Sequence, residues 1–195
     1  MHVHLEPHNP AWFEEFARTK SNLEQALSGV PVVAIEHVGS TSIPGLLAKP
    51  IIDIDIICKR EDMGIVRKAM IEAGYSDRGD LGIPGRIAFV QPEASSVEMR
   101  RNTYAVVEGS LCLKNHLDLK RMILQDAGLK QEYAEIKLAM AHKEVPDVDA
   151  YCTGKNAVVL KILRAAGWTD QELEEVKRAN DTRDHIAHDR LIPTQ

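Results

Sequence analysis

Residues 33–57 constrain the fold of this chain more than any other stretch, because they read as a strand, a tight turn and a second strand carrying two acids. The first apolar run ends at Gly39, and an isoleucine-rich run follows with Asp53 and Asp55 inside it. Successive side chains of a strand point to opposite faces, so the two acids project from one side. The other side is filled by isoleucines, at Ile52, Ile54 and Ile56. The pattern predicts a sheet with one apolar face and one acidic face.

The pairing of Asp53 with Asp55 indicates a metal site. Two carboxylates at neighbouring positions on one face repel each other, and strand propensity gives no reason to place them there. A divalent cation relieves that repulsion. Mg²⁺ is usually held by one or two carboxylates together with phosphate oxygens of a substrate. We therefore expect these two acids to bind Mg²⁺ or Mn²⁺ and to carry any catalysis.

The turn at Gly39 and Ser40 supplies the other half of such a site. A glycine after a strand lets the backbone approach a ligand closely, and Ser40 can cap a short following helix. Exposed N–H groups at a helix start attract phosphate. A Gly-Ser pair alone is common at strand ends. Here an Asp-x-Asp sequence follows fourteen residues after Gly39, which makes the combination far more specific.

This combination resembles the core pattern of the nucleotidyltransferase superfamily, in which the turn holds a nucleoside triphosphate and the acid pair holds the metal. The sequence of residues 36–45 and 48–53 resembles that of the GrpB family within that superfamily. The likeness extends from the helix at Pro10 to the helix carrying Lys155. It implies that a nucleotidyl group passes from a nucleoside triphosphate to an unknown small-molecule or protein acceptor.

The resemblance also implies which residues contact the nucleotide. These residues are Gly39, Ser40, Thr41, Ser42 and Lys49. The residue pattern leaves Lys49 open, because a lysine before a proline is also an ordinary exposed residue.

Substrate contacts are expected from later segments. A glycine-rich loop ends at Arg86, and its sequence resembles a GrpB signature. The loop either forms a long hairpin connection or places Arg86 in contact with a phosphate or carboxylate of the substrate. His116 and Lys120 lie one helical turn apart and either face the cleft, as the resemblance implies, or lie on the helix surface. Arg100 and Arg101 form an anion clamp or, the favoured interpretation, are solvated loop charges.

Composition limits the remaining possibilities. The 195 residues fit one domain with a helical extension, and 44% hydrophobic and 27% charged residues are typical of a soluble globular protein. Without an apolar run long enough for a membrane span, or a secretion signal at the start, we expect a cytoplasmic location. A net charge of −5 argues against a nucleic-acid partner. The separated cysteines, Cys58, Cys112 and Cys152, indicate neither a disulfide framework nor a zinc site.

Periodicity and breaker residues predict the order of elements. Helices are expected over 10–29, 59–73, 110–127, 129–143, 153–166 and 169–179, and further strands over 87–90 and 104–107. The fold class expected is α/β (α+β), with a nucleotidyltransferase-like mixed β-sheet flanked by helices. Residues 1–108 form the core with its N-terminal helix, residues 109–180 a helical portion packed on it, and residues 181–195 a mobile tail.

One departure from the superfamily pattern limits the functional prediction. The last strand occupies the place of a third acid, yet its interior offers Asn102, Thr103 and Ala105 instead, with Glu98 and Glu108 only flanking it. Three classes therefore stay open. The chain is a metal-dependent nucleotidyltransferase, a catalytically weak or inactive nucleotide-binding module, or a helical interaction protein on the same scaffold.

Overall fold

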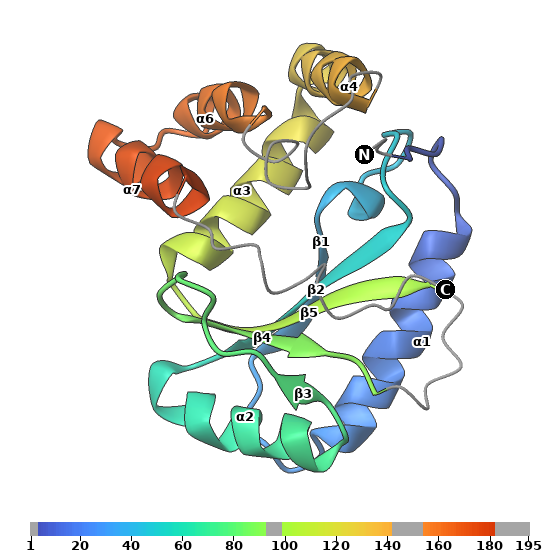
Figure 1. Ribbon diagram of the computed structural model, residues 1–195, viewed down its shortest axis with the longest axis vertical. Coiled ribbons are helices and arrows are strands. Elements are labelled where there is room, and N and C mark those ends of the chain that lie inside the picture. The colour runs from blue at the N-terminus through green and yellow to red at the C-terminus, as the bar shows by residue number, and fades with distance from the viewer. Residues whose placement is uncertain (1–3, 93–98, 142–153, 182–195) are drawn as a thin grey trace.

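A five-stranded mixed sheet forms the centre of the molecule (Figure 1). The computed structural model describes residues 4–92, 99–141 and 154–181. The strand order is β1-β2-β5-β4-β3, and β2 pairs with β5 in parallel while the other pairs are antiparallel. The strands are β1 Ala34–Val38, β2 Ile51–Cys58, β3 Ser76–Asp77, β4 Arg86–Val90 and β5 Arg100–Val107.

Helices cover both faces of this sheet. Figure 1 shows α1 and α2 on one side and α3 crossing the other, with α4, α6 and α7 gathered around α3. The helices are α1 Ala11–Ala26, α2 Met63–Glu72, α3 Leu111–Gln125, α4 Ala127–Ala141, α6 Asn156–Ala165 and α7 Asp170–Asp181, with short 3₁₀ turns η1 Ser40–Ser42 and η2 Arg60–Asp62. This arrangement confirms the predicted α/β class, the mixed sheet and the helical C-terminal portion.

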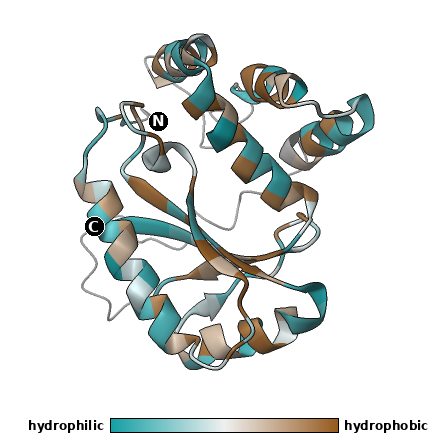
Figure 2. Ribbon diagram, turned by 180° about the vertical axis from the view of Figure 1, so that it is seen from behind, coloured by the Kyte–Doolittle hydropathy of each residue, from teal (hydrophilic) through white to brown (hydrophobic). Residues whose placement is uncertain are grey.

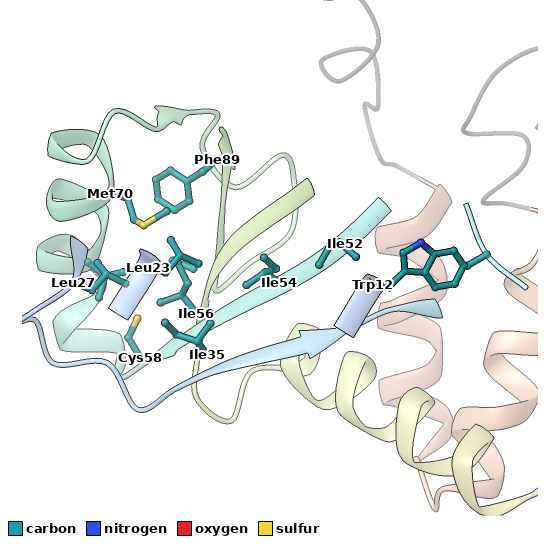
Figure 3. Close-up of a cluster of buried hydrophobic side chains, with 13 residues drawn as sticks. Trp12, Leu23, Leu27, Ile35, Ile52, Ile54, Ile56, Cys58, Met70 and Phe89 are labelled. Atoms are coloured by element: carbon teal, nitrogen blue, oxygen red, sulfur yellow. The ribbon is translucent and has the colours of Figure 1, made fainter. Parts of the chain in front are cut away.

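The apolar face of β2 fixes its register. Ile52, Ile54 and Ile56 are fully buried in one cluster with residues of α1 and α2, and Figure 3 shows Ile56 beside Leu23 and Ile52 toward Trp12. Burying each such side chain stabilises the fold by roughly 1.5–3 kcal/mol. If the pairing register of β2 shifted by one residue, the aspartates would enter the apolar core and the isoleucines would leave it, since neighbouring residues in a strand face opposite sides of the sheet. The predicted alternation is confirmed.

On the opposite face, Ile57 and Val106 pack against Cys112 and Leu113 at the start of α3. A separate apolar cluster joins the helical portion to the loop after η1, through residues that include Ile43, Leu46, Ile123, Tyr133 and Ile162. Figure 2 shows the helices banded in both colours, as expected for helices with one buried side. The C-terminal portion is therefore attached directly to the segment between the turn and β2.

Strand β5 is longer than predicted and changes the interpretation of Arg101. The strand begins at Arg100, and the Arg101 guanidinium donates hydrogen bonds to Thr19 Oγ1 at 2.8 Å and to Gln91 Oε1 at 3.1 Å. Only 6% of that side chain is exposed. The prediction of a solvated loop charge was wrong for Arg101, because α1 lies against this end of the sheet and the arginine ties the two together.

Some predictions fall beyond the described residues. Asp181 is the last residue of α7, while the remainder of the predicted tail, together with Glu98 and Cys152, lies outside them. Cys58 and Cys112 are free thiols. Within the described ranges, no helix has both the length and the apolar character that a bilayer crossing requires.

Candidate functional site

Asp53 and Asp55, the acid pair, lie on the face of β2 opposite the isoleucines. Asp55 is fully buried, and its neighbours in register are Glu36 of β1 and Tyr104 of β5. Burial raises the pKa of Asp53, and the nearby Asp55 carboxylate raises it further. The two acids therefore interact across one sheet face, as the sequence predicts.

The turn after β1 lies directly against the acid pair. Gly39 has φ 70° and ψ −174°, a backbone conformation nearly confined to glycine. A Cβ at this position would lie 2.1 Å from Asp53 Oδ2. Glycine is required here both by the backbone angles and by the carboxylate.

The residues of η1 divide into two kinds. Thr41 and Ser42 are buried, and their hydroxyls donate to Ile51 O at 3.0 Å and Gly39 O at 2.7 Å. These two side chains build the turn and join it to the start of β2. Ser40 is more exposed. Lys49 is partly buried after the turn, and its contact with a nucleotide stays a prediction.

Asn102 stands beside Asp53 at the place predicted for a third acid. The two residues are in register between β5 and β2, and Asn102 Nδ2 donates to Asp53 Oδ1 at 2.8 Å. This hydrogen bond lowers the pKa of Asp53 and partly offsets its burial. Glu108, the predicted flanking substitute, is exposed after the strand ends. A neutral amide therefore orients Asp53.

His116 of α3 reaches the other acid. Its Nδ1 lies 2.7 Å from Asp55 Oδ2, and its Nε2 lies 3.9 Å from Cys112 Sγ. Burial alone would lower the pKa of His116, but the Asp55 carboxylate raises it well above the ordinary value of 6.5. His116 Nδ1 and Asp55 Oδ2 are therefore hydrogen-bond partners. The structure thus places His116 at the acid pair. A contact between His116 and a substrate stays a prediction.

Lys120, one turn further along α3, lies at the end of β1. Its Nζ donates to His37 O at 2.7 Å. Burial lowers the pKa of this ammonium, and Glu36 opposes the shift. Lys120 therefore anchors α3 to the strand that leads into the turn, so both predicted residues of α3 lie at the same edge of the site.

Arg86 lies on the same sheet face, two strands from β2. It opens β4, and its guanidinium carbon is 4.5 Å from the centre of the Tyr104 ring. Since Tyr104 is the neighbour of Asp55 in register, the arginine belongs to the surroundings of the acid pair.

Lys137 interacts electrostatically with two lysines from other segments, Lys49 and Lys155, and we call these three residues the lysine cluster. Lys137 of α4 is only 2% exposed, and its Nζ donates to Leu47 O at 2.5 Å. Burial and the charges of Lys155 and Lys49 lower its pKa from 10.5 to about 7, while Asp53 opposes that shift. The positive charge of Lys155 also lowers the pKa of Asp53.

Sequence reasoning did not single out Lys137, although a signal was present. Leu129, Tyr133 and Lys137 are the buried residues of α4 and share one stripe of the helix. A lysine in an apolar stripe is unusual, because burying an ammonium is costly without a partner. The position therefore indicates a role beyond packing.

The acid pair suits a hard divalent cation. Asp55 Oδ1 is buried and accepts no hydrogen bond within the described part of the chain. Within those same residues, no group of three or more His, Cys, Asp and Glu side chains is arranged to hold a metal ion. Two carboxylates fit a cation whose other ligands come from a substrate, which is the usual way Mg²⁺ binds.

One solved structure shares the fold of this chain, and a second matches it more weakly. The crystal structure of conserved protein GrpB from Enterococcus faecalis matches with a TM-score of 0.70 at 24% identity, over 89% of this chain and 99% of that chain. A Cid1 poly(U) polymerase structure matches with a TM-score of 0.43 at 15% identity, over 68% of this chain and 45% of that chain.

Sequence relatives come from several bacteria. UPF0157 protein SCO7215 of Streptomyces coelicolor is 30% identical over 86% of each chain, and UPF0157 protein PA4798 of Pseudomonas aeruginosa is 32% identical over 84% of this chain and 67% of that protein. UPF0157 protein YqkA of Bacillus subtilis is 29% identical over 76% of this chain, which spans only 43% of that relative. The family described as "GrpB protein" matches residues 2–165, which contain all five strands and every described helix except α7, and the chain therefore belongs to the GrpB family.

Proposed function

We propose that this protein binds a nucleoside triphosphate with Mg²⁺ at the acid pair and transfers the nucleotidyl group to a small-molecule or protein acceptor. One observation carries the proposal: the glycine turn lies against Asp53 of the acid pair, and the charges of Lys137 and Lys155 interact with that same carboxylate. Carboxylates suit the cation, and ammonium groups suit the phosphates. A metal–nucleotide complex is the ligand that uses both.

The polyphosphate is assigned to the lysine cluster and the turn. Lys137 has a pKa of about 7 because it is buried beside two other cations. A phosphate oxygen nearby favours the charged form of this lysine and offsets that repulsion. The Gly39 backbone, which has no side chain, lets phosphates approach Asp53 closely. Lys49 brings a further positive charge from the segment before β2.

The remaining residues orient the acids. Asp53 and Asp55 would hold Mg²⁺ or Mn²⁺, which when bound neutralises charge on the phosphates. The Asn102 amide holds Asp53 Oδ1, and His116 holds Asp55 Oδ2. Asp55 Oδ1 and Asp53 Oδ2 then remain as the oxygens directed at the ligand.

A second candidate is a nucleotide-binding module without transfer activity. Asn102, an amide in place of a carboxylate beside Asp53, specifically favours it. A single cation held by two acids is enough to bind a metal–nucleotide complex. Activating an acceptor with a second cation usually needs another carboxylate.

Thermal-shift measurements with each nucleoside triphosphate, with and without Mg²⁺, test binding. A ligand at a hundred times its Kd adds about 2.7 kcal/mol of stability. At about 2–4 °C per kcal/mol for a chain of this size, we expect a rise in Tm of about 5–10 °C that requires Mg²⁺. Asp53→Asn should abolish the rise, whereas Glu108→Gln, an exposed acid outside the site, should retain it. A chain whose Tm responds to no nucleotide would contradict both candidates.

Pyrophosphate release then separates the two candidates. Release from a nucleoside triphosphate that depends on Mg²⁺ and is lost in Asp53→Asn supports nucleotidyl transfer. Saturable binding with no release, in the presence of cell metabolites that can serve as acceptors, supports the binding module instead.

A further inference from the structure

Arg86 is a buried cation that forms no ion pair with any acid among the described residues. Only 7% of the residue is exposed, and its Nε is buried without a hydrogen-bond acceptor in residues 4–92, 99–141 and 154–181. Its Nη2 donates to Asp80 O at 3.4 Å, a long bond to a neutral carbonyl. Buried charges in proteins are normally paired and hydrogen-bonded. The arrangement therefore leaves a place for an anion.

The position of Arg86 relates it to the acid pair. Arg86 is in register with Val106, and Tyr104, one step along the same face of β5, is in register with Asp55. With strands spaced about 4.8 Å apart and alternate residues about 6.7 Å apart, the Cα atoms of Arg86 and Asp55 are on the order of 12 Å apart. That separation is comparable to the length of a small molecule.

Two aromatic rings lie between Arg86 and Asp55. The Arg86 guanidinium lies over the Tyr104 ring, and the Tyr104 ring centre is 6.4 Å from that of His116. His116 in turn contacts Asp55. A guanidinium, two rings and a carboxylate thus form one continuous row across the sheet.

The loop before β4 lies against this arginine. Asp80 supplies the carbonyl that accepts from Arg86, and Leu81 beside it has φ 50°, an uncommon conformation for a residue with a branched side chain. A carboxylate or phosphate group is a stronger acceptor for guanidinium than a neutral carbonyl, and its geometry matches the guanidinium fork. Such a group can take the place of the Asp80 carbonyl.

We infer that Arg86 binds an oxyanion of the acceptor, so that the acceptor is a carboxylate or a phosphate ester. This inference rests on the proposed function, because only a transfer reaction has an acceptor. The oxyanion lies at Arg86, over Tyr104, while the nucleotide occupies the turn and the acid pair. Arg86 is then a specificity-determining residue. The competing explanation is that Arg86 only fastens the loop to the sheet.

Arginine Nε–Hε resonances in ¹⁵N-labelled protein distinguish these explanations. Loss of one cross-peak in Arg86→Lys assigns it. The wild-type protein is titrated with succinate and, separately, with inorganic phosphate at constant ionic strength, without nucleotide or metal. We expect the Arg86 cross-peak to move and saturate, while that of Arg60, an exposed arginine on η2, stays in place. The probe that saturates at lower concentration identifies the oxyanion as carboxylate or phosphate.

A cross-peak of Arg86 that stays fixed, or that moves linearly together with that of Arg60, would overturn the inference. The amide spectrum of Arg86→Lys checks that the variant folds. The same titration is repeated in Asp53→Asn, which should not respond to nucleotide. Its Arg86 cross-peak should still move with the oxyanion, which separates this inference from the proposed function. If the wild-type protein binds nucleotide but its Arg86 cross-peak does not respond, only the inference is contradicted. If the Arg86 cross-peak responds but no nucleotide binds, only the proposed function is contradicted.

Discussion

Gly39→Ala tests whether the turn and the acid pair form one unit. The new Cβ would lie 2.1 Å from Asp53 Oδ2 and 2.8 Å from its Cγ, so the carboxylate must move. The backbone at φ 70° and ψ −174° is itself nearly closed to alanine, at a cost of about 1–3 kcal/mol. We expect the free energy of unfolding to fall by at least that much, and the nucleotide response to be lost with it.

Gly29→Ala is the matched control. Gly29 also has a positive φ, 78°, but a Cβ there meets no atom within 4 Å. It therefore reports the strain of a positive φ alone, about 1–2 kcal/mol. Urea denaturation gives the free energy of unfolding of each variant, and thermal shift with MgATP gives the ligand response.

The expected pattern is specific. Gly29→Ala loses stability and keeps the full response to MgATP. Gly39→Ala loses more stability, with Tm lowered by about 2–4 °C for each kcal/mol lost, and no longer responds. If Gly39→Ala responded to MgATP as fully as Gly29→Ala does, the assignment of the turn to the nucleotide site would be wrong.

Four further predictions concern the surroundings of the site and the helical portion. Lys137→Met should weaken nucleotide binding about ten- to hundredfold by calorimetry, the size of one charge-assisted contact; unchanged affinity would remove Lys137 from the site. Because the pKa of Lys137 falls from 10.5 to about 7 on folding, the unfolded chain binds more protons between these values. The free energy of unfolding should therefore rise from pH 7 to pH 10 more in wild type than in Lys137→Met, and parallel pH curves would contradict the burial argument. Asn102→Asp should lower the Tm of the metal-free protein through repulsion with Asp53 and enlarge its response to Mn²⁺, and a smaller Mn²⁺ response would argue against a metal at this edge. Thr169→Ala removes the two hydrogen bonds of the Thr169 hydroxyl, which accepts from Glu172 N and donates to Glu172 Oε2 at the start of α7, and should cost about 1 kcal/mol in urea denaturation; an unchanged free energy of unfolding would contradict a stabilising role for this cap.

The sequence was sufficient for the sheet because hydrophobic patterning there is strict. The alternation of isoleucine and aspartate in β2 predicted which face is apolar, and the glycine turn could be placed before it. The helix predicted over 169–179 likewise corresponds to α7, whose start is capped by hydrogen bonds between Thr169 and Glu172. These are local signals, each complete within a few residues.

Contacts between distant segments could not be predicted in the same way. Arg101 looked like a loop charge because its partner Thr19 lies on a helix eighty-two residues earlier in the chain. Lys137 approaches Asp53 only because α4 packs on the loop that follows the turn. Thr41 and Ser42 carry hydroxyls suited to phosphate, and only the folded turn shows that those hydroxyls bond to backbone carbonyls.

The most direct test of the central claim is a crystal structure of the protein soaked with ATP and Mn²⁺. We predict an anomalous peak for Mn²⁺ at about 2.1 Å from oxygens of both Asp53 and Asp55, with phosphates between the Gly39 turn and the lysine cluster. Nucleotide bound elsewhere, or Mn²⁺ absent from the acid pair while nucleotide is present, would contradict the account.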